Sequence, residues 1–593
     1  MIDRRRPVFA PELLARVGLA WVMICALLLV TSYPAISALR FPDPDDVMRL
    51  MQVRDLLAGQ SWFDVHQYRV DAAGGGVPMH WSRLVDLPIA AAVWFFALFM
   101  VQGTAETVAA VIVPLITFGF ALLLGGRIAW RLVGAEAAGF ACLAMALSVP
   151  LISHMRPLRI DHHGWQIVLA LLAVNGLMAR SPRLGGWLTG FALALWMSVS
   201  VEGLPFAVAI CGIAALRWVR ERRDSIWLVT IMGALAASSA VLFIGTRGLA
   251  DLAQHCDAIS PVHLVIFAWV AAGAFGLSRC EPIPRVGLLC GLGLIAAGAG
   301  AIVLYAAPQC AGGGFVALDP LVSEFWYHSV GEGMPVWQQP PALALQIIIP
   351  PLIGLIATLK LAARSAIWLR QWWYEYALLL GAALLVALFV ARAGSVAGAL
   401  AAVPLGWQIS QWIRQARNLR QQSRRVLALA GTALVLMPAM PLTLLTMALT
   451  MAAPARASLD TGSPRPSSCE IQQASAALRA LPVGEIIAPI DIGPQLLYDT
   501  PQSVIATGHH RGSPGMRIVI DTFIGSAQAA HQTAVERGSL YLALCPDLVE
   551  PHKYRMAAPD GLMARLTRGD VPEWLDPVEI PGEGTMKIWR IRH

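Results

Sequence analysis

Uninterrupted apolar runs, each about as long as a bilayer is thick, dominate the sequence. A helix needs roughly 20 apolar residues to cross the hydrocarbon core of a membrane, and such runs recur from residues 14–39 onward. Hydrophobic residues make up 57% of the 593 residues and charged residues only 14%, whereas soluble domains carry roughly 25% charged residues. The chain is therefore predicted to be a mainly α-helical, polytopic membrane protein. The first run is too long, and is followed by too many others, to be a cleaved signal peptide.

Basic residues set the expected orientation in the membrane. Asp3-Arg4-Arg5-Arg6 precedes the first run, and cytoplasmic loops carry an excess of Lys and Arg, so the N-terminus is expected to stay in the cytoplasm. Basic loops then follow every second run, provided that the short apolar segment at residues 87–101 is an interfacial or re-entrant helix on the outer side. This count gives about thirteen spans in an inner (plasma) membrane. The net charge of +7 comes largely from these loops, so it reports orientation in the bilayer and not nucleic-acid binding.

After Ala455 the composition changes to a mixture of polar and apolar residues, and residues 464–468 are typical of a linker. We therefore predict a membrane domain over residues 1–455 and a small C-terminal α/β domain over residues 456–593. The last span, over residues 426–451, leads outward, which places this domain on the extracytoplasmic side. Its expected elements are helices over residues 472–481 and 522–538 and strands over residues 485–490, 503–506 and 586–591.

Cysteine positions agree with this orientation. Cys256, Cys310, Cys469 and Cys545 all fall on the oxidising side of the membrane. Cys469 and Cys545 could bridge the C-terminal domain, and Cys256 and Cys310 could join two outer loops. The other cysteines lie in or beside spans, where a thiol behaves as a small apolar group.

Three carboxylates fall within four positions directly after the first apolar run, in the segment Phe41-Pro42-Asp43-Pro44-Asp45-Asp46. Carboxylates this close repel one another unless a cation lies among them, and oxygen ligands suit a hard divalent ion such as Mg²⁺ or Mn²⁺. Pro42 and Pro44 are expected to hold the segment extended. The alternative is a solvated acidic loop in which Asp45 or Asp46 caps a helix over residues 47–58.

The other polar outliers fall on the same, outer side of the membrane. They are the turn Asp161-His162-His163, the segment 329–332 that ends at Glu332, and Arg392. Polar groups near membrane depth are costly and usually functional. An Asp and two His at the exit of a span could complete the divalent site that the first acidic segment begins. The alternatives are an N-cap role for Asp161 and an interfacial location for the two histidines.

The order of these motifs resembles that of the GT-C superfamily of membrane glycosyltransferases, and within it the catalytic subunit of oligosaccharyltransferases of the archaeal and bacterial single-subunit type. In that family an acidic motif after the first span precedes a helix with Arg-Asp, here Arg54-Asp55. A second acidic motif often reads Asp-His-His in archaeal members, as at residues 161–163. A Thr/Ser-x-x-Glu motif in a large outer loop matches Glu332, and an Arg at the outer end of a late span matches Arg392. The likeness covers nearly the whole chain.

The resemblance implies a glycosyltransferase that moves a sugar or an oligosaccharide from a polyisoprenyl phosphate- or pyrophosphate-linked donor to an acceptor on the extracytoplasmic (periplasmic) side. By its spacing to Arg54-Asp55, Asp45 aligns best with the family's essential carboxylate. Glu332 would position the acceptor from a mobile loop, and Arg392 would neutralise the leaving pyrophosphate. The loops 40–105 and 307–341 would border the active site. The implied ligands of Mg²⁺ or Mn²⁺ are Asp43, Asp45, Asp46, Asp161, His162 and His163.

One departure from the family concerns the acceptor. The family's Trp-Trp-Asp motif holds the hydroxyl of an Asn-x-Ser/Thr acceptor, and the matching segment here, residues 488–495, keeps Asp491 but has neither tryptophan. The acceptor is therefore left open between protein, lipid and glycan. Residues 80–83 and 507–512 offer further substrate contacts, or else form an interfacial anchor and a solvated loop. With Asp491, the candidate substrate-binding residues are His80, Arg83, His509, His510 and Arg511.

Two other functions are compatible with a polytopic chain. A transporter or lipid flippase should place charges near the middle of its spans and often has internal repeats, and neither feature is found in this sequence. A metal-independent glycan ligase or polymerase would have little use for an acidic segment paired with Asp161. The sequence therefore favours a metal-dependent sugar transferase.

Overall fold

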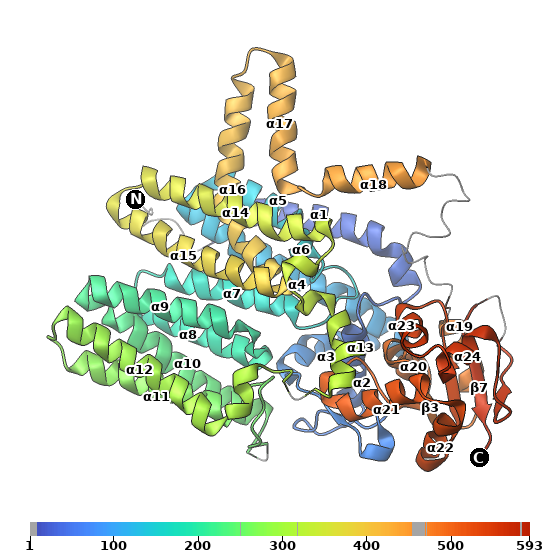
Figure 1. Ribbon diagram of the computed structural model, residues 1–593. Coiled ribbons are helices and arrows are strands. Elements are labelled where there is room, and N and C mark those ends of the chain that lie inside the picture. The colour runs from blue at the N-terminus through green and yellow to red at the C-terminus, as the bar shows by residue number, and fades with distance from the viewer. Residues whose placement is uncertain (1–8, 250, 317, 453–468, 470, 581–583) are drawn as a thin grey trace. The chain divides into compact units, whose positions relative to one another are not determined.

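The computed structural model describes the chain except for residues 1–8, 250, 317, 453–468, 470 and 581–583 (Figure 1). The chain divides into two compact units. The first, which we call the bundle unit, comprises Met1–Arg40, Ser82–Gly314 and Gly331–Ala452. The second, the C-terminal unit, comprises Phe41–Trp81, Phe315–Val330 and Ala453–His593. Two loop segments far apart in the sequence thus fold with the C-terminal region.

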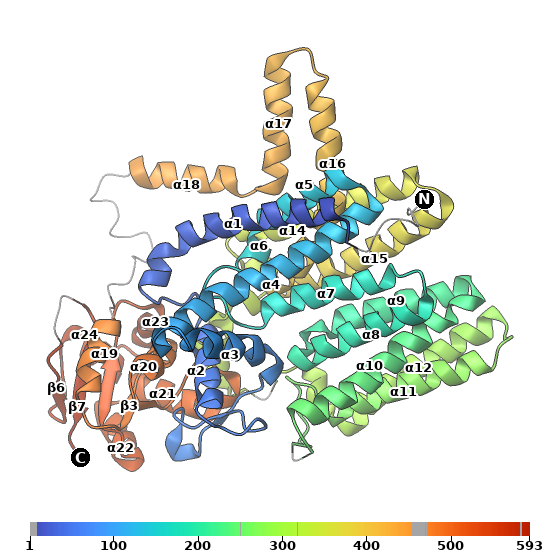
Figure 2. The same ribbon diagram turned by 180° about the vertical axis from the view of Figure 1, so that it is seen from behind.

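Among the residues that the structure describes, the bundle unit consists of helices and the loops that join them. Neighbouring helices pack in the order α1, α4, α7, α8, α10, α11 and α12 (Figure 2). The helices are α1 (Pro11–Ser37), α3 (Arg83–Ala97), α4 (Gln102–Leu132), α5 (Ala135–Ala146), α6 (Val149–Ile152), α7 (His163–Leu177), α8 (Pro182–Val199), α9 (Leu204–Arg220), α10 (Ser225–Thr246), α11 (Pro261–Arg279), α12 (Arg285–Ala306), α14 (Pro341–Arg364), α15 (Ile367–Phe389), α16 (Gly394–Arg417), α17 (Gln422–Leu436) and α18 (Met440–Ala452).

Among the described residues, eight helices are long and apolar enough to cross a membrane, or nine if one bent pair counts as a single span. The remaining predicted spans correspond to α5, α7, α8 and α16, which are shorter or less apolar. The segment 87–101, predicted as a short interfacial or re-entrant helix, forms most of α3 and is not among the eight. The structure therefore supports a multi-pass membrane protein.

The last predicted span, residues 426–451, is not one straight helix. It consists of α17 and α18, whose axes differ by 92° (Figure 1). Pro438 lies in the break between them, and proline cannot donate the backbone hydrogen bond that a continuous helix needs. Hydropathy alone did not reveal this break because both halves are apolar.

Glycines bring α8 and α10 into close contact. A Cβ atom added at Gly190 of α8 would overlap the carbonyl oxygen of Ile231 and the Ala234 side chain, and one added at Gly186 would overlap Thr230. The two glycines are four residues apart, so they lie on one face of the helix. Small residues at this spacing let two helices approach closely in a membrane. This packing fixes α8, which leads into the loop that carries Glu202.

The C-terminal unit is built on a five-stranded mixed sheet in the order β4-β3-β5-β7-β6. Strand β3 pairs in parallel with β4 and β5, and β7 pairs antiparallel with β5 and β6. These strands are β3 (Glu485–Ile487), β4 (Ser503–Val504), β5 (Tyr541–Leu544), β6 (Leu575–Pro577) and β7 (Lys587–Ile591). The helices of this unit are α2 (Pro44–Leu57), α13 (Pro320–Phe325), α19 (Ile471–Arg479), α20 (Gly493–Asp499), α21 (Ser513–Ile524), α22 (Ala527–Arg537), α23 (Val549–Ala557) and α24 (Leu562–Arg568). A separate small hairpin pairs β1 (His66–Gln67) with β2 (Val77–Pro78).

The predicted elements of this unit are largely present. The helix at 472–481 and the strands at 485–490, 503–506 and 586–591 correspond to α19, β3, β4 and β7. The single helix predicted over residues 522–538 is wrong, because the chain forms α21 and α22 instead. Ser526 separates them, and its hydroxyl accepts a hydrogen bond from the Ala529 N–H as the N-cap of α22. Both predicted disulfides, Cys256–Cys310 and Cys469–Cys545, are present.

The segment Phe41–Trp81 is held to the C-terminal sheet by hydrogen bonds. Backbone bonds join Asp71 N to Val504 O and Val504 N to Arg69 O, at 2.8 and 2.9 Å. The Arg69 guanidinium donates to the carbonyl oxygens of Leu497 and Thr500, at 2.6 and 2.8 Å. The loop with the first acidic segment is therefore part of this unit's fold.

The α8–α10 contact predicts a position-specific loss of stability. Gly190→Leu should lower the free energy of unfolding by about 1–3 kcal/mol because the new side chain has no space against α10. Gly212→Leu in α9 is the matched control, since a Cβ there meets nothing within 4 Å. Thermal unfolding of the two purified variants in detergent gives their melting temperatures, and that of Gly190→Leu should be the lower. Equal melting temperatures would contradict the packing described for Gly190.

Candidate active site

Four loops at helix ends bring charged side chains together in the bundle unit. The loop before α7 carries Asp161, and a turn between α8 and α9 carries Glu202. The short helical turn Gly331–Gly333 carries Glu332, and the turn Ala391–Ala393 between α15 and α16 carries Arg392. Asp161, Glu332 and Arg392, predicted from the sequence to lie on one side of the membrane, thus converge in one cluster.

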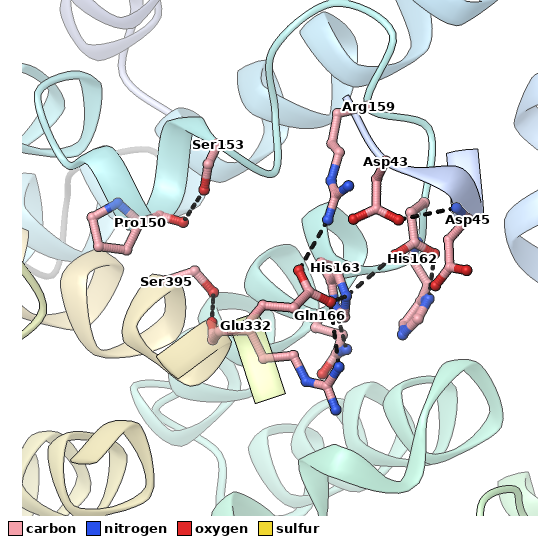
Figure 3. Close-up of polar contacts among 12 residues, drawn as sticks. Asp43, Asp45, Pro150, Ser153, Arg159, His162, His163, Gln166, Glu332 and Ser395 are labelled. Atoms are coloured by element: carbon pink, nitrogen blue, oxygen red, sulfur yellow. Dashed lines mark hydrogen bonds and ion pairs between the residues drawn. The ribbon is translucent and has the colours of Figure 1, made fainter. Parts of the chain in front are cut away.

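Glu332 lies at the centre of this cluster. Its Oε2 accepts from Arg159 Nη2 at 3.1 Å, and its Oε1 lies 3.3 Å from Arg392 Nη1 and 3.3 Å from His163 Nε2 (Figure 3). Burial by itself would raise the pKa of the Glu332 carboxyl, but His163, Arg392 and Arg159 together lower that pKa well below its usual range. Glu332 is therefore an ionised carboxylate held by several positively polarised donors.

Arg392 has a second carboxylate partner, Glu202. The distance from Arg392 Nη2 to Glu202 Oε1 is 2.5 Å. The other oxygen of Glu202 accepts from Gln166 Nε2 at 3.1 Å, and Gln166 Oε1 in turn accepts from Trp196 Nε1 at 3.0 Å. The indole N–H can only donate, so it fixes which end of the Gln166 amide faces Glu202.

Asp161, His162 and His163 offer a set of ligands that fits a divalent cation. One ligand atom from each lies within 4.8 Å of the others, and all three side chains are buried. Asp161 Oδ1 accepts from His162 Nδ1 at 2.5 Å, and Asp161 Oδ2 lies 3.2 Å from His163 Nε2. A carboxylate with two imidazoles is a donor set that transition metals accept readily, and Mg²⁺ less so. The N-cap of α7 is His162, so the alternative N-cap role of Asp161 is wrong.

The first acidic segment is extended at Asp43, as predicted, but helical from Pro44 onward. Pro44 is the first residue of α2, and Asp43 is its N-cap, whose Oδ1 accepts from Asp45 N at 3.0 Å. Proline suits the first helical position because its fixed φ is helical and no N–H is needed there. The capping role expected for Asp45 or Asp46 thus falls to Asp43, and both residues lie in the first turn. Metal binding by these three residues stays a prediction.

Two predicted substrate-binding segments meet in the C-terminal unit. His80 Nδ1 lies 2.8 Å from His509 Nε2, and the two rings stack. His510 lies against both rings, and Phe315 packs edge-on against His510. Arg83, by contrast, belongs to the bundle unit, where it is fully buried and paired with Asp86 at 3.3 Å. Substrate binding by these residues and by Arg511 stays a prediction.

Asp491 lies in a turn that a buried carboxylate holds in place. Glu550 accepts from the backbone N–H groups of Ile490 and Asp491, both at 2.8 Å, and from the Tyr554 hydroxyl at 2.5 Å. Burial, followed by the nearby Asp491 carboxylate, raises the pKa of Glu550 to about 8. Glu550 therefore fixes the backbone at the place where the family has its Trp-Trp-Asp motif.

Solved structures of other proteins share the fold of this chain. No family model matches the sequence, and no curated protein matches it. The archaeal oligosaccharyltransferase AglB from Archaeoglobus fulgidus, in complex with an inhibitory peptide and a dolichol-phosphate, superposes with a TM-score of 0.66 and 14% identity, over 95% of this chain and 72% of that chain. The oligosaccharyltransferase of the same organism tethered to an acceptor peptide with the NVT sequon gives a TM-score of 0.64 and 14% identity, over 97% and 74%. The predicted resemblance is confirmed at the level of the fold.

Sequence reasoning missed Glu202, Arg159 and Gln166. A signal for Glu202 was present, because it interrupts two apolar runs at a point where the predicted topology emerges on the outer side. Arg159 stands two residues before Asp161, in the same outer turn. Gln166 had no comparable signal, since a single amide in an apolar helix points to no particular partner.

The raised pKa of Glu550 predicts a pH-dependent stability. The folded chain holds the Glu550 proton more tightly than the unfolded chain, whose carboxyl has its ordinary pKa near 4.5. The contribution of Glu550 to stability is therefore complete below about pH 4.5 and is lost as the pH rises toward about 8. In Glu550→Gln that loss should be absent.

Urea unfolding of the C-terminal unit at a series of pH values between 5 and 8 gives the free energy of unfolding of the wild-type chain and of Glu550→Gln. A wild-type curve with the same slope against pH as the variant would rule out the assignment.

Proposed function

We propose that this chain is a membrane glycosyltransferase that moves a sugar or an oligosaccharide from a polyisoprenyl phosphate- or pyrophosphate-linked donor to an acceptor on the extracytoplasmic side. The observation that carries the proposal is the convergence of Arg159, Arg392 and His163 on one carboxylate, in a chain with the fold of an oligosaccharyltransferase. Guanidinium groups that bind a carboxylate also suit a phosphate, which is anionic and presents oxygen pairs at a similar spacing.

The proposed chemistry follows from charge. A lipid phosphate leaves well only when the negative charge that develops on it is neutralised. Arg392 and Arg159 are fixed cationic donors at the site and would supply that neutralisation. Asp45, the carboxylate singled out by the family resemblance, would orient or deprotonate the acceptor nucleophile. A donor phosphate would displace Glu332 from Arg392, and Glu332 would then position the acceptor.

Asp161, His162 and His163 are the proposed ligands of a divalent cation in the bundle unit, and Asp43, Asp45 and Asp46 are the further ligands implied by the sequence. When bound, such a cation would add positive charge at the donor phosphate. Imidazole ligands suit Mn²⁺ better than Mg²⁺, so of these two ions we propose Mn²⁺.

The proposal covers protein, lipid and glycan acceptors. The turn with Asp491 is held rigidly by Glu550, yet it lacks both tryptophans of the family motif. His80, His509, His510 and Arg511 are proposed to contact the donor phosphate or the acceptor. The solved archaeal relatives were captured with a dolichol-phosphate and with peptides, which supports a lipid-linked donor for this chain and makes a peptide acceptor one of the candidates.

The position of the charged groups favours a transferase over a transporter. A transporter should bind its substrate near the middle of the membrane, between broken helices. Asp161, Glu332 and Arg392 instead lie in loops at the ends of helices.

Transfer assays test the proposed function directly. Membranes with the wild-type chain should transfer radiolabelled sugar from a lipid-linked donor, and EDTA or Asp45→Ala should each reduce the rate about a hundredfold or more. EDTA removes the cation that adds positive charge at the donor phosphate, and Asp45→Ala removes the carboxylate that orients or deprotonates the acceptor nucleophile. Asp560→Ala, which changes an exposed carboxylate, should leave the rate unchanged. Full transfer in the presence of EDTA and in Asp45→Ala would refute the metal-dependent mechanism.

Metal binding has a readout that does not depend on activity. Free Mn²⁺ gives a strong electron paramagnetic resonance signal that decreases on binding, so titration of the purified chain yields an affinity. Asp161→Asn should weaken that affinity by at least about tenfold, whereas His552→Gln, a change at an exposed histidine, should not. Equal affinities for the wild-type chain and Asp161→Asn would show that Asp161 is no ligand.

A further inference from the structure

The guanidinium of Arg392 is shared between two carboxylates that are held very differently. Glu202 lies 2.5 Å from Arg392 Nη2, and Glu332 lies 3.3 Å from Arg392 Nη1. The two carboxylates come from separate turns, Val201–Gly203 and Gly331–Gly333. Which of them stays when a ligand binds depends on how each is anchored.

Glu202 is anchored through several hydrogen bonds. Its backbone N–H donates to the hydroxyl of Ser200, and its second carboxylate oxygen accepts from Gln166. Gln166 is held by Trp196, a buried residue of α8. Each oxygen of Glu202 thus has its own partner, and the turn that carries it lies directly between α8 and α9.

The Glu332 carboxylate is held by ion pairs with Arg159, Arg392 and His163. The turn that carries it is held by backbone and amide hydrogen bonds: Gln339 Nε2 donates to the Gly331 and Met334 carbonyl oxygens, and Ala391 N–H donates to Met334 O. Glu332 stands between Gly331 and Gly333, and a Cβ atom added at either glycine would meet nothing within 4 Å. Its backbone turn is a single helical turn in a long loop. An incoming anion could also engage all three partners of its carboxylate.

Arg392 has a donor to spare for such an anion. Its Nε is buried and has no hydrogen-bond acceptor among the residues that the structure describes. A guanidinium carries five N–H donors in a fixed plane, so the bond to Glu202 leaves donors for a phosphate on the remaining edge. An arginine that lost both carboxylates would be a largely buried, unpaired charge, which is costly.

We propose that Glu202 is a positioning residue for Arg392. It holds the guanidinium in place, while Glu332 is the exchangeable partner that a donor phosphate displaces. This inference rests on the proposed function, because Arg392 is taken to bind the phosphate of a lipid-linked donor. It assigns opposite roles to two carboxylates on one arginine.

The test uses binding of dolichyl phosphate to the purified full-length chain in detergent with Mn²⁺. Glu202→Gln keeps the shape of the side chain but removes its charge, and it should weaken binding about tenfold. Glu332→Gln removes the competing carboxylate and should tighten binding. The matched control is Glu375→Gln, because Glu375 is also a buried carboxylate paired with an arginine, Arg217 at 2.7 Å, but lies outside the cluster. Its affinity should equal that of the wild-type chain.

A double-mutant cycle separates positioning from a general structural role. If Glu202 acts through Arg392, the variant that combines Glu202→Gln with Arg392→Ala should bind no more weakly than Arg392→Ala alone. Wild-type affinity in Glu202→Gln, or a loss that adds fully to that of Arg392→Ala, would overturn the positioning role.

The two proposals fail in different ways. Absence of dolichyl phosphate binding by the wild-type chain would overturn the proposed donor class. Normal binding by the wild-type chain, together with unchanged binding by Glu202→Gln, would overturn only the role of Glu202.

Discussion

Charge buried inside a helical bundle must be paired, and the candidate active site depends on this constraint. Arg392, Arg159 and His163 each face a carboxylate from another loop, with Glu332 between them. Removing one partner from such a group is costly because it leaves a buried charge unpaired. The ion pairs therefore fix four loops relative to one another. They are the loop before α7, the turn between α8 and α9, the loop before α14 and the turn after α15. The charged side chains of the candidate site are thus held in place by one another.

A separate set of constraints applies in the C-terminal unit. The segment Phe41–Trp81 pairs with β4 through Asp71 and Val504, and Arg69 binds carbonyl oxygens at the end of α20. The candidate catalytic carboxylate Asp45 thus belongs to the same compact unit as Asp491, which marks the altered acceptor motif. These hydrogen bonds tie the segment that carries Asp45 to the C-terminal sheet. A domain boundary drawn at residue 455 from composition alone does not reveal this connection.

Much of the fold could be predicted because its signals are strong. Long apolar runs and basic loops locate the helices, and the same pattern of basic loops predicts that Asp161, Glu332 and Arg392 lie on one side of the membrane. The break at Pro438 and the division of residues 522–538 were missed because both segments keep a continuous apolar or helical pattern. The pairings of Glu202 and Glu550 were missed for a different reason. Each residue acts through partners distant in the sequence, Arg392 and the Asp491 backbone, and no local pattern reveals such a pairing.

We propose above all that this chain attaches a lipid-linked sugar to an acceptor outside the cytoplasm. Mass spectrometry of surface glycoproteins and glycolipids, from cells that carry the wild-type chain and from cells that carry only an Asp161→Asn chain, tests it most directly. The account predicts that one class of glycoconjugate loses its sugar in the variant cells. Loss of an Asn-linked glycan would identify a protein acceptor despite the missing tryptophans. Identical glycan profiles in both cell types would contradict the account.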